Sequence, residues 1–326
     1  MKSAEPLTRT VSAKHPAIRS WSEVSGRRPE PARVQLLKNE HDRKVWRLIG
    51  LGPAGSNVIA KLNPEPDVAA EHRIYHEALN RLPLLAADHY GLLKDKNDSL
   101  CWAFLEDMRG IPYSPDEKEH WRVTAEFLAV LHTSGFEILR DIQLPDRGPS
   151  YYQHCLRAGR RRVCSALDHG HLTQSQRNVL TGIVEQCDDT ERRWPQLEEF
   201  CGSMPQTFVH GDLGERNVCL RPGLPEPRVV LFDWVSAGWG FCGIDLTPDN
   251  LDLVAYSIVV RKVWPTLDVT TCKNMAAVGQ LFRLLWAIHG ASEYVESEGE
   301  RLYWTIDTMS YYRADMAVAL RACSAL

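Results

Sequence analysis

This sequence lacks several features that mark common protein classes. The nine cysteines are scattered along the 326 residues, and no two of them form a C-x-x-C pair. This excludes a zinc ribbon and a disulfide framework and indicates reduced thiols. No uninterrupted apolar run is long enough to span a membrane, and the first thirty residues contain no apolar segment of the kind found in secretory signals. We therefore expect a cytoplasmic protein without a membrane partner.

The sequence also lacks a strong charge of either sign. Its 38 Lys and Arg residues against 42 Asp and Glu residues give a formal net charge of −4 at pH 7. This balance produces no long-range field that would attract nucleic acid, so a nucleic-acid partner is not expected. Hydrophobic residues at 44% and charged residues at 25% are typical of a globular protein. A chain of this length is expected to form two lobes rather than one core.

Local patterns change from strand-like to helix-like along the chain. Short apolar segments and one amphipathic run predict a small antiparallel sheet with a helix. These segments are residues 33–37, 44–49, 57–61, 68–82 (the helix), 89–93 and 100–105. From residue 115 the pattern is mainly helical, apart from strands and loops at 208–245. We predict an α+β, bilobal protein with a polar leader (1–25), an N-terminal nucleotide-binding lobe (26–108) and a helical C-terminal lobe (109–326).

One loop carries the strongest chemical signal. In His210-Gly-Asp-Leu-Gly-Glu-Arg-Asn217, the residues Asp212 and Asn217 have a fixed spacing, and the apolar segment 229–232 leads into Asp233. Phosphoryl transfer needs a carboxylate that orients the attacking hydroxyl and hard oxygen ligands for Mg²⁺. Asp212 is therefore the candidate catalytic base, and Asn217 and Asp233 are candidate Mg²⁺ ligands. Each piece alone is common, because Asp and Asn often close turns or cap helices; the combination is specific.

These motifs resemble those of the aminoglycoside phosphotransferase and choline kinase superfamily, which is related to the protein kinases. The similarity rests on the loop 210–217, on Phe232-Asp-Trp234, and on Gly243-Ile-Asp245-Leu, which is similar to the family's second structural aspartate. The resemblance implies a protein-kinase-like fold with ATP and Mg²⁺ as cofactors. It also implies the same roles for Asp212, Asn217 and Asp233.

The resemblance further implies a lysine at a strand end that contacts the phosphates and pairs with a helix glutamate. Lys61 ends the segment Val58-Ile-Ala-Lys61. Glu71 is the preferred partner because Glu71-His-Arg-Ile-Tyr75 is similar to the family's E-x-x-x-Y, and Glu77 is the second choice. Without the family resemblance, the alternative interpretation of Lys61 is a solvent-exposed lysine at the end of a strand, which is the commonest situation for a lysine.

Two loops are expected to contact the nucleotide. The turn that covers the phosphates is expected at residues 39–43, between the first two strands, where glycine is missing and Arg43 offers a positive charge. The glycine-rich segment 50–55 lies between the second and third strands, and its proline removes a backbone donor, so we do not expect it to bind phosphate. The inter-lobe hinge is expected at Leu105-Glu106-Asp107-Met108, by resemblance. Glu106 and Met108 are therefore expected to bind adenine through their backbone groups. Recognition by backbone groups would also allow GTP to bind.

Three functions remain open from the sequence. The first is a small-molecule kinase that phosphorylates a hydroxyl of an antibiotic, amino sugar or similar natural product, since HGDLGERN is especially similar to the loop of bacterial antibiotic kinases. The second is a kinase for Ser or Thr of a peptide in natural-product tailoring, with residues 151–200 as the docking region. The third is a nucleotide-binding pseudokinase regulator, which the joint presence of Lys61, Asp212, Asn217 and Asp233 disfavours.

Overall fold

The chain folds into two compact units that interleave along the sequence. The computed structural model describes residues 8–40, 42–96, 99–169, 172–223, 227–246 and 250–325. Unit 1 comprises Met1–Tyr113 and Gly214–Val235, and unit 2 comprises Ser114–Leu213 and Ser236–Leu326. The sequence analysis placed a single boundary after residue 108, where the composition changes. A change in composition does not reveal that a later segment returns to the first unit.

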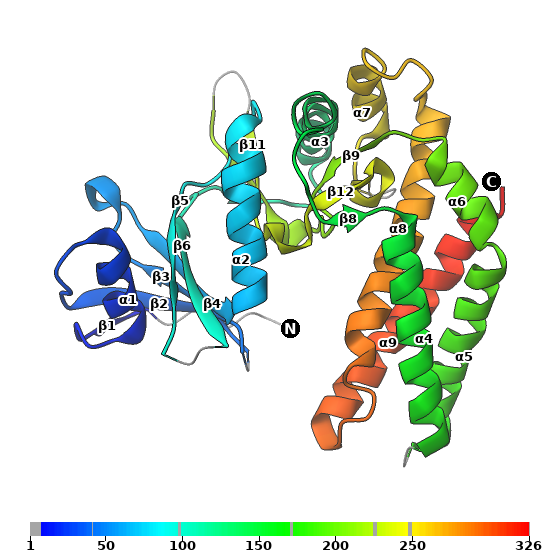
Figure 1. Ribbon diagram of the computed structural model, residues 1–326, viewed down its shortest axis with the longest axis horizontal. Helices are drawn as coiled ribbons and strands as arrows, with labels where there is room; N and C mark the ends of the chain where they lie inside the picture. Colours follow the sequence, from blue (N-terminus) through cyan, green and yellow to red (C-terminus); the bar gives the residue numbers. More distant parts are fainter. Residues whose placement is uncertain are drawn as a thin grey trace. The chain divides into compact units, whose positions relative to one another are not determined.

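Unit 1 is built on a six-stranded antiparallel sheet, visible with its helices in Figure 1. The strand order is β1-β2-β3-β4-β6-β5, so β5 is an edge strand and β6 lies between β4 and β5. The strands are β1 (Thr8–Val11), β2 (Ala32–Asn39), β3 (Lys44–Leu48), β4 (Val58–Pro64), β5 (His89–Lys94) and β6 (Leu100–Glu106). Each strand predicted for the first lobe is present, which confirms the expected antiparallel sheet.

One helix covers each face of this sheet. The helix α1 (Pro16–Ser25) contributes Trp21 to a core with Trp102 and Phe104 of β6, whereas α2 (Glu65–Arg73) packs against the alternate β6 residues. Successive side chains of a strand point to opposite faces, so a single apolar strand serves both cores. The predicted polar leader thus contains β1 and α1, because a few apolar residues at helical spacing suffice to anchor an otherwise polar segment.

The helix α2 changes its winding near its end. It begins at Glu65, earlier than predicted, because proline is well accommodated in the first turn of a helix. A π-helical turn follows at Ile74–Ala78, and a 3₁₀ turn at Leu79–Arg81 completes the predicted helical segment. A second, three-stranded sheet of unit 1 has the order β11-β10-β7, with β7 (Ile111–Pro112), β10 (Val218–Arg221) and β11 (Arg228–Leu231).

Unit 2 is mainly helical, as the sequence predicts. Its helices are α3 (Lys118–Ile138), α4 (Pro149–His169), α5 (Gln174–Arg192), α6 (Trp194–Gly202), α7 (Leu253–Val260), α8 (Val269–Ser292) and α9 (Gly299–Ala322). Four of them, α4, α5, α8 and α9, pack side by side (Figure 1) around stacked rings that include Tyr152 and Phe282, whose centroids are 4.8 Å apart. A small sheet has the order β8-β12-β9, with β8 (Asp146–Arg147), β12 (Gly238–Phe241) and β9 (Gln206–Val209).

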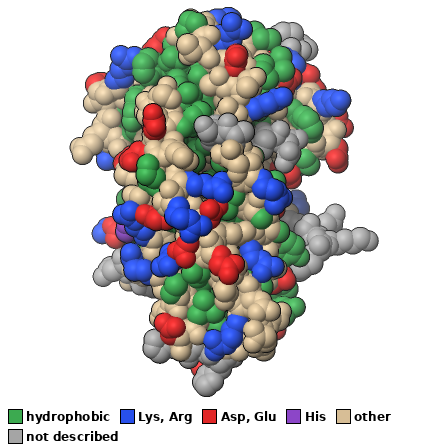
Figure 2. All heavy atoms as spheres, turned by 90° about the vertical axis from the view of Figure 1, so that its right-hand side faces the viewer, with side chains coloured by type: hydrophobic (Ala, Val, Ile, Leu, Met, Phe, Trp, Pro, Cys, Tyr) green, Lys and Arg blue, Asp and Glu red, His purple; other side chains and the backbone are tan. Residues whose placement is uncertain are grey.

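The exposed face of the helical unit mixes charges of both signs. Figure 2 shows basic and acidic side chains interspersed over the face in view. The ion pairs Arg157–Glu191 and Arg160–Asp188 join α4 to α5. Such exposed pairs keep the surface solvated and add little stability. Among the helices in the described ranges, none combines the length and the apolar character needed to cross a bilayer.

Candidate functional site

Unit 1 contains a cavity of about 690 Å³. Part of its wall comes from the six-stranded sheet, where Val45 of β3 is opposite Lys61 of β4, and Arg47 is opposite Ile59. Because alternate residues of a strand face the same side, these four side chains lie together on the cavity face. Another part of the wall comes from the segment that returns to unit 1 after residue 213 and includes Asn217, Phe232 and Asp233.

A buried ion pair fixes the ammonium group of Lys61 in this wall. The Nζ atom donates hydrogen bonds to Glu71 Oε1 at 2.8 Å and Oε2 at 3.1 Å, and the Glu71 side chain is 2% exposed. Burial alone lowers the pKa of Lys61, but the carboxylates of Glu71 and Asp233 outweigh burial and hold this pKa above its ordinary value of 10.5. The cavity therefore contains a permanent cation. The second choice, Glu77, instead pairs with Arg73 at 2.8 Å.

Asp233 occupies a strained backbone position just after β11. Its φ of 62° lies in the left-handed region, where Ala54 is the other non-glycine residue among those that the structure describes. Aspartate tolerates this region better than most residues, but the conformation still costs energy and is concentrated at functional sites. The side chain is 48% exposed, and Oδ1 lies 3.7 Å from Lys61 Nζ. The next residue, Trp234, donates its backbone N–H to Glu71 Oε1 at 3.4 Å.

Asn217 is held beside Asp233 by backbone pairing. It ends a 3₁₀ turn at Glu215–Asn217 and is buried, and its carbonyl oxygen accepts the N–H of Phe232 at 2.9 Å. The following pair, Val218 and Leu231, continues this register into the ladder of β10 and β11. An amide oxygen and a carboxylate thus line the same cavity, and oxygen donors of this kind suit Mg²⁺.

The opposite end of the cavity contains the predicted hinge and a polar network that the sequence analysis missed. Glu106 and Met108 both line the cavity. The carboxylate of Asp107 accepts hydrogen bonds from Arg47 Nε at 2.8 Å and from Asn57 Nδ2 at 2.8 Å, and this carboxylate is 7% exposed. The alternation of side chains along a strand could have indicated that Arg47 faces the cavity, because Arg47 follows Val45 by two residues and therefore lies on the same face of the strand.

Arg43, which is expected to bind phosphate, is paired with a carboxylate of α2. Its guanidinium group forms an ion pair with Asp67 of α2 at 2.6 Å, and it is not one of the residues that line the cavity. The charge of Arg43 is therefore compensated by Asp67. His41, in the predicted phosphate turn, is outside the described residues.

In unit 2, a buried aspartate holds the start of the predicted catalytic loop. Asp245 is fully buried and accepts the backbone N–H groups of His210 at 2.7 Å and Gly211 at 2.8 Å, while His132 Nε2 lies 3.2 Å from its Oδ2. Burial acts to raise the pKa of Asp245, but the hydrogen bond and charge of His132 and the contacts with His210 hold it below its ordinary value of 3.8. The loop is therefore attached to an ionised, fully bonded carboxylate.

Gly211 is required by the path of this loop. Its φ is 80°, and a Cβ atom added there would lie 2.4 Å from the carbonyl oxygen of Ser236. Only glycine combines a left-handed backbone with the absence of a side chain. The loop therefore passes close to the backbone of Ser236 at Gly211, the residue before Asp212.

Asp212 forms a hydrogen bond within its own loop and is close to a half-buried arginine, Arg283. Its N–H donates to His210 Nδ1 at 3.3 Å, and Arg283 of α8 donates to the carbonyl oxygen of Leu213 at 3.4 Å. Burial lowers the pKa of Arg283, and the negative charges of Asp245 and Asp212 act against this shift. Sequence reasoning missed Arg283, although a single arginine within the apolar run Leu281–Ile288 was a visible signal.

Comparison with known protein families identifies the family of this chain. The model of the family described as "Phosphotransferase enzyme family" matches residues 33–270. This range begins within β2, includes Lys61 and the loop 210–217, and extends past Asp245. No curated protein matches the chain.

Several solved structures share the fold. Choline kinase from Cryptosporidium parvum Iowa II is 12% identical, over 88% of this chain and 90% of that chain, with a TM-score of 0.56. A GDP complex of an aminoglycoside 2′-phosphotransferase IIIa variant is 11% identical over 86% and 91%, with a TM-score of 0.58. Spectinomycin phosphotransferase in complex with ADP and spectinomycin is 9% identical over 89% and 93%, with a TM-score of 0.56. At these identities the likeness shows a common kinase-like fold.

Proposed function

This chain belongs to the phosphotransferase enzyme family, and on that premise we propose that it transfers the γ-phosphoryl group of ATP to a hydroxyl of an antibiotic or amino-sugar-like natural product. The observation that carries the proposal is the cluster of Lys61, Glu71 and Asp233 in the cavity of unit 1. A cavity of about 690 Å³ falls in the range that suits ligands of nucleotide size.

The triphosphate is assigned to the end of the cavity that contains Lys61. Glu71 holds the lysine in one geometry, so the cation meets the phosphates without first losing side-chain freedom. The adenine base of the nucleotide is assigned to the opposite end of the cavity. There it would lie among the apolar side chains of Leu37, Ile59 and Leu105 and beside the backbone of Glu106 and Met108. An apolar slot with a few polar groups is typical of a cofactor site.

Asn217 and Asp233 are the residues that would hold Mg²⁺. Both line the cavity, both offer oxygen, and the left-handed backbone at Asp233 directs its half-exposed carboxylate towards the side of Lys61. When bound, Mg²⁺ neutralises charge that develops on the phosphoryl oxygens. The carboxylate of Asp233 would also keep Lys61 protonated, which the raised pKa of this lysine supports.

Asp212 is assigned as the base that accepts the proton of the acceptor hydroxyl. Asp245 positions the loop through the N–H groups of His210 and Gly211, so Asp212 is presented on a backbone with little freedom. Arg283 of α8 brings a positive charge to this loop through its hydrogen bond to the carbonyl oxygen of Leu213. Transfer then proceeds in line, without a covalent enzyme intermediate.

The choice of acceptor rests on two supports. The loop HGDLGERN is similar to that of antibiotic kinases, and the solved structures of similar fold include phosphotransferases for an aminoglycoside and for spectinomycin. Choline kinase also shares the fold, so a small amino alcohol belongs in the same test.

The test measures ADP release from purified protein with ATP and Mg²⁺ against aminoglycosides, spectinomycin, macrolides, nucleosides, choline and peptides. We expect one hydroxylated small molecule to stimulate release, and Asp212→Asn to reduce its turnover on the order of 10³-fold while ATP affinity is retained. Asp307→Asn, which changes an exposed aspartate of α9, is the matched control and should keep full turnover. Turnover by Asp212→Asn within tenfold of the unmodified protein contradicts the assignment, as does the absence of stimulation by every acceptor.

A further inference from the structure

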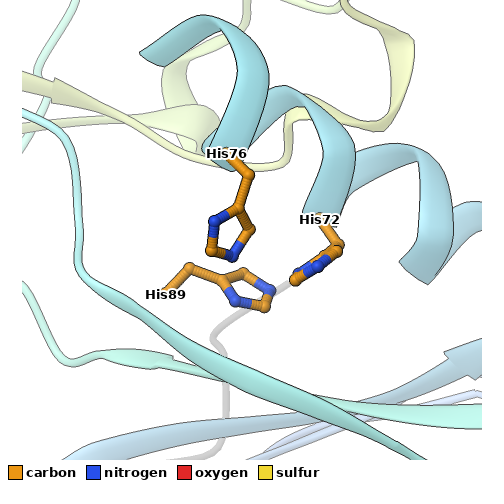
Figure 3. Close-up of side chains that lie close together, drawn as sticks. All are labelled: His72, His76 and His89. Atoms are coloured by element: carbon orange, nitrogen blue, oxygen red, sulfur yellow. The ribbon is translucent and has the colours of Figure 1, made fainter. Parts of the chain in front are cut away.

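Three histidines from separate segments of unit 1 converge outside the residues that line the nucleotide cavity. In Figure 3 the rings of His72, His76 and His89 point toward one another, two from the helical segment and one from the start of β5. The ring centroid of His72 lies 4.2 Å from that of His76 and 4.7 Å from that of His89. The centroids of His76 and His89 are 5.6 Å apart. One nitrogen from each ring lies within 4.8 Å of the other two.

The local winding of the helix helps to bring two of these rings together. His72 lies in the last turn of α2, and His76 lies in the π-helical turn Ile74–Ala78. Residues four apart lie on one side of a helix, and a π-helical turn between them alters their spacing. π-helical turns are rare and are found frequently at functional sites. The histidine pair and the unusual winding therefore occur at the same place.

The imidazole nitrogens of this cluster lack the partners that buried polar groups normally have. Among the residues that the structure describes, no hydrogen-bond partner reaches the buried Nδ1 of His72 or either ring nitrogen of His89. Buried polar atoms are almost always bonded, and an exception calls for an unseen water or ion. Burial, together with the neighbouring His72 and His76, lowers the pKa of His89 to about 4, and burial also lowers the pKa of His72. A neutral imidazole has one nitrogen lone pair that can bind a metal ion.

We propose that His72, His76 and His89 bind a divalent late transition-metal ion, with Zn²⁺ as the best match. Imidazole nitrogen is a preferred ligand of Zn²⁺, whereas Mg²⁺ prefers oxygen. Bond lengths of about 2.0 to 2.1 Å place the ligand nitrogens of a tetrahedral zinc site about 3.4 Å apart. From a present spacing of up to 4.8 Å, the ligand nitrogens need to approach one another by at most about 1.4 Å, a shift that small rotations about the side-chain bonds can produce. Three histidines leave the fourth position to water.

The position of this site suggests what the ion would do. His72 directly follows Glu71, which holds Lys61, and the ring of Tyr75, which lines the cavity, has its centroid 5.3 Å from that of His89. An ion at the three histidines would join α2 to the start of β5 and so hold Glu71 and Tyr75 in place. The site is therefore assigned a structural role beside the nucleotide cavity, distinct from the oxygen ligands Asn217 and Asp233.

The experiment titrates Zn²⁺ by calorimetry into the full chain, prepared without a polyhistidine tag and held in excess Mg²⁺. We expect one Zn²⁺ per chain and a higher melting temperature with Zn²⁺. His76→Gln should weaken binding by about tenfold or more, since even loss of an outer partner of a metal site costs that much. His76 is exposed, so this variant should keep the melting temperature of the metal-free protein. His89→Gln should also weaken binding, and His154→Gln, an exposed histidine of unit 2, should not.

A spectroscopic readout separates this site from adventitious binding. Co²⁺ in place of Zn²⁺ should give the visible absorption of a tetrahedral nitrogen-ligated ion, and His76→Gln should abolish it. Equal Zn²⁺ affinity in the unmodified protein, His76→Gln and His89→Gln overturns the proposal, and so does the absence of saturable Zn²⁺ binding. Neither measurement uses a phosphoryl acceptor, so the outcome does not depend on whether the proposed reaction is correct.

Discussion

Two aspartates in this molecule have the same side chain and opposite surroundings. Asp233 has a strained left-handed backbone, is 48% exposed and has a cation 3.7 Å away. Asp245 is fully buried and accepts two backbone N–H groups while contacting a histidine. A buried carboxylate with both oxygens hydrogen-bonded to the protein supports structure, whereas one held at an energetic cost and left half-exposed is available to a ligand. The partners of a residue, more than its type, therefore indicate its role.

The largest expected effect comes from Asp233→Asn. Asparagine tolerates the left-handed backbone, so the change removes the charge and keeps the geometry. We expect turnover to fall on the order of 10³-fold because the substitution weakens the ligand that we propose for Mg²⁺. The free energy of unfolding should change by less than about 1 kcal/mol, because a half-exposed ion pair contributes little. Steady-state ADP release and denaturant unfolding of the same preparation measure both quantities. A large loss of stability would remove the contrast with Asp245.

Asp245→Asn should show the reverse pattern, with stability as the main loss. The amide replaces one acceptor by a donor that faces backbone N–H groups, so buried hydrogen bonds are lost. We expect the free energy of unfolding to fall by about 2 to 4 kcal/mol. Urea unfolding followed by circular dichroism measures this change, and Asp307→Asn again serves as the exposed control. A fall below about 0.5 kcal/mol, the range of ordinary surface substitutions, would show that the network around Asp245 is dispensable.

The same variant also has a pH signature with a defined sign. The pKa of Asp245 is lower in the folded protein than its ordinary value of 3.8. The carboxylate therefore contributes stability above pH 3.8, and this contribution is lost as the pH falls through the lower, folded pKa. Below about pH 4, the stability of Asp245→Asn should consequently depend less on pH than that of the unmodified protein. Identical acid profiles would contradict the assigned role.

The smallest effect is expected from a comparison of alanine with asparagine at position 233. Alanine has no side-chain group that favours the left-handed region, so Asp233→Ala should be less stable than Asp233→Asn by about 1 kcal/mol. Asp233→Gly should recover most of this difference because glycine adopts positive φ readily. Melting temperatures of the three variants test the order. Equal values for alanine and glycine would show that the backbone at this position is not strained.

The sequence predicted those parts of the structure that depend on neighbouring residues. The strands of unit 1 followed from alternation and branched side chains, and Lys61 lies opposite Val45 because both belong to such strands. The helical character of unit 2 followed from periodicity in the same way. The family motifs directed attention to Glu71 rather than Glu77, and the structure indeed joins Lys61 to Glu71.

The remaining features depend on contacts between distant segments, which no local pattern contains. The helix α1 was missed because its apolar face consists of a few residues in a polar segment. Arg43 was assigned to phosphate because its partner Asp67 belongs to another element. Arg283 and the three histidines were missed for the same reason, since His89 meets His72 only after the chain has passed from the helix to β5.

The interleaving of the two units has a consequence for how the protein is made. The chain passes from one unit to the other after residues 113, 213 and 235. During synthesis from the N-terminus, unit 1 acquires Asn217 and Asp233 only after the first hundred residues of unit 2 have left the ribosome. A single cut anywhere in the chain therefore yields no fragment that contains unit 1 alone and complete. An engineered exchange of the whole of unit 1 accordingly requires three junctions within the chain rather than one.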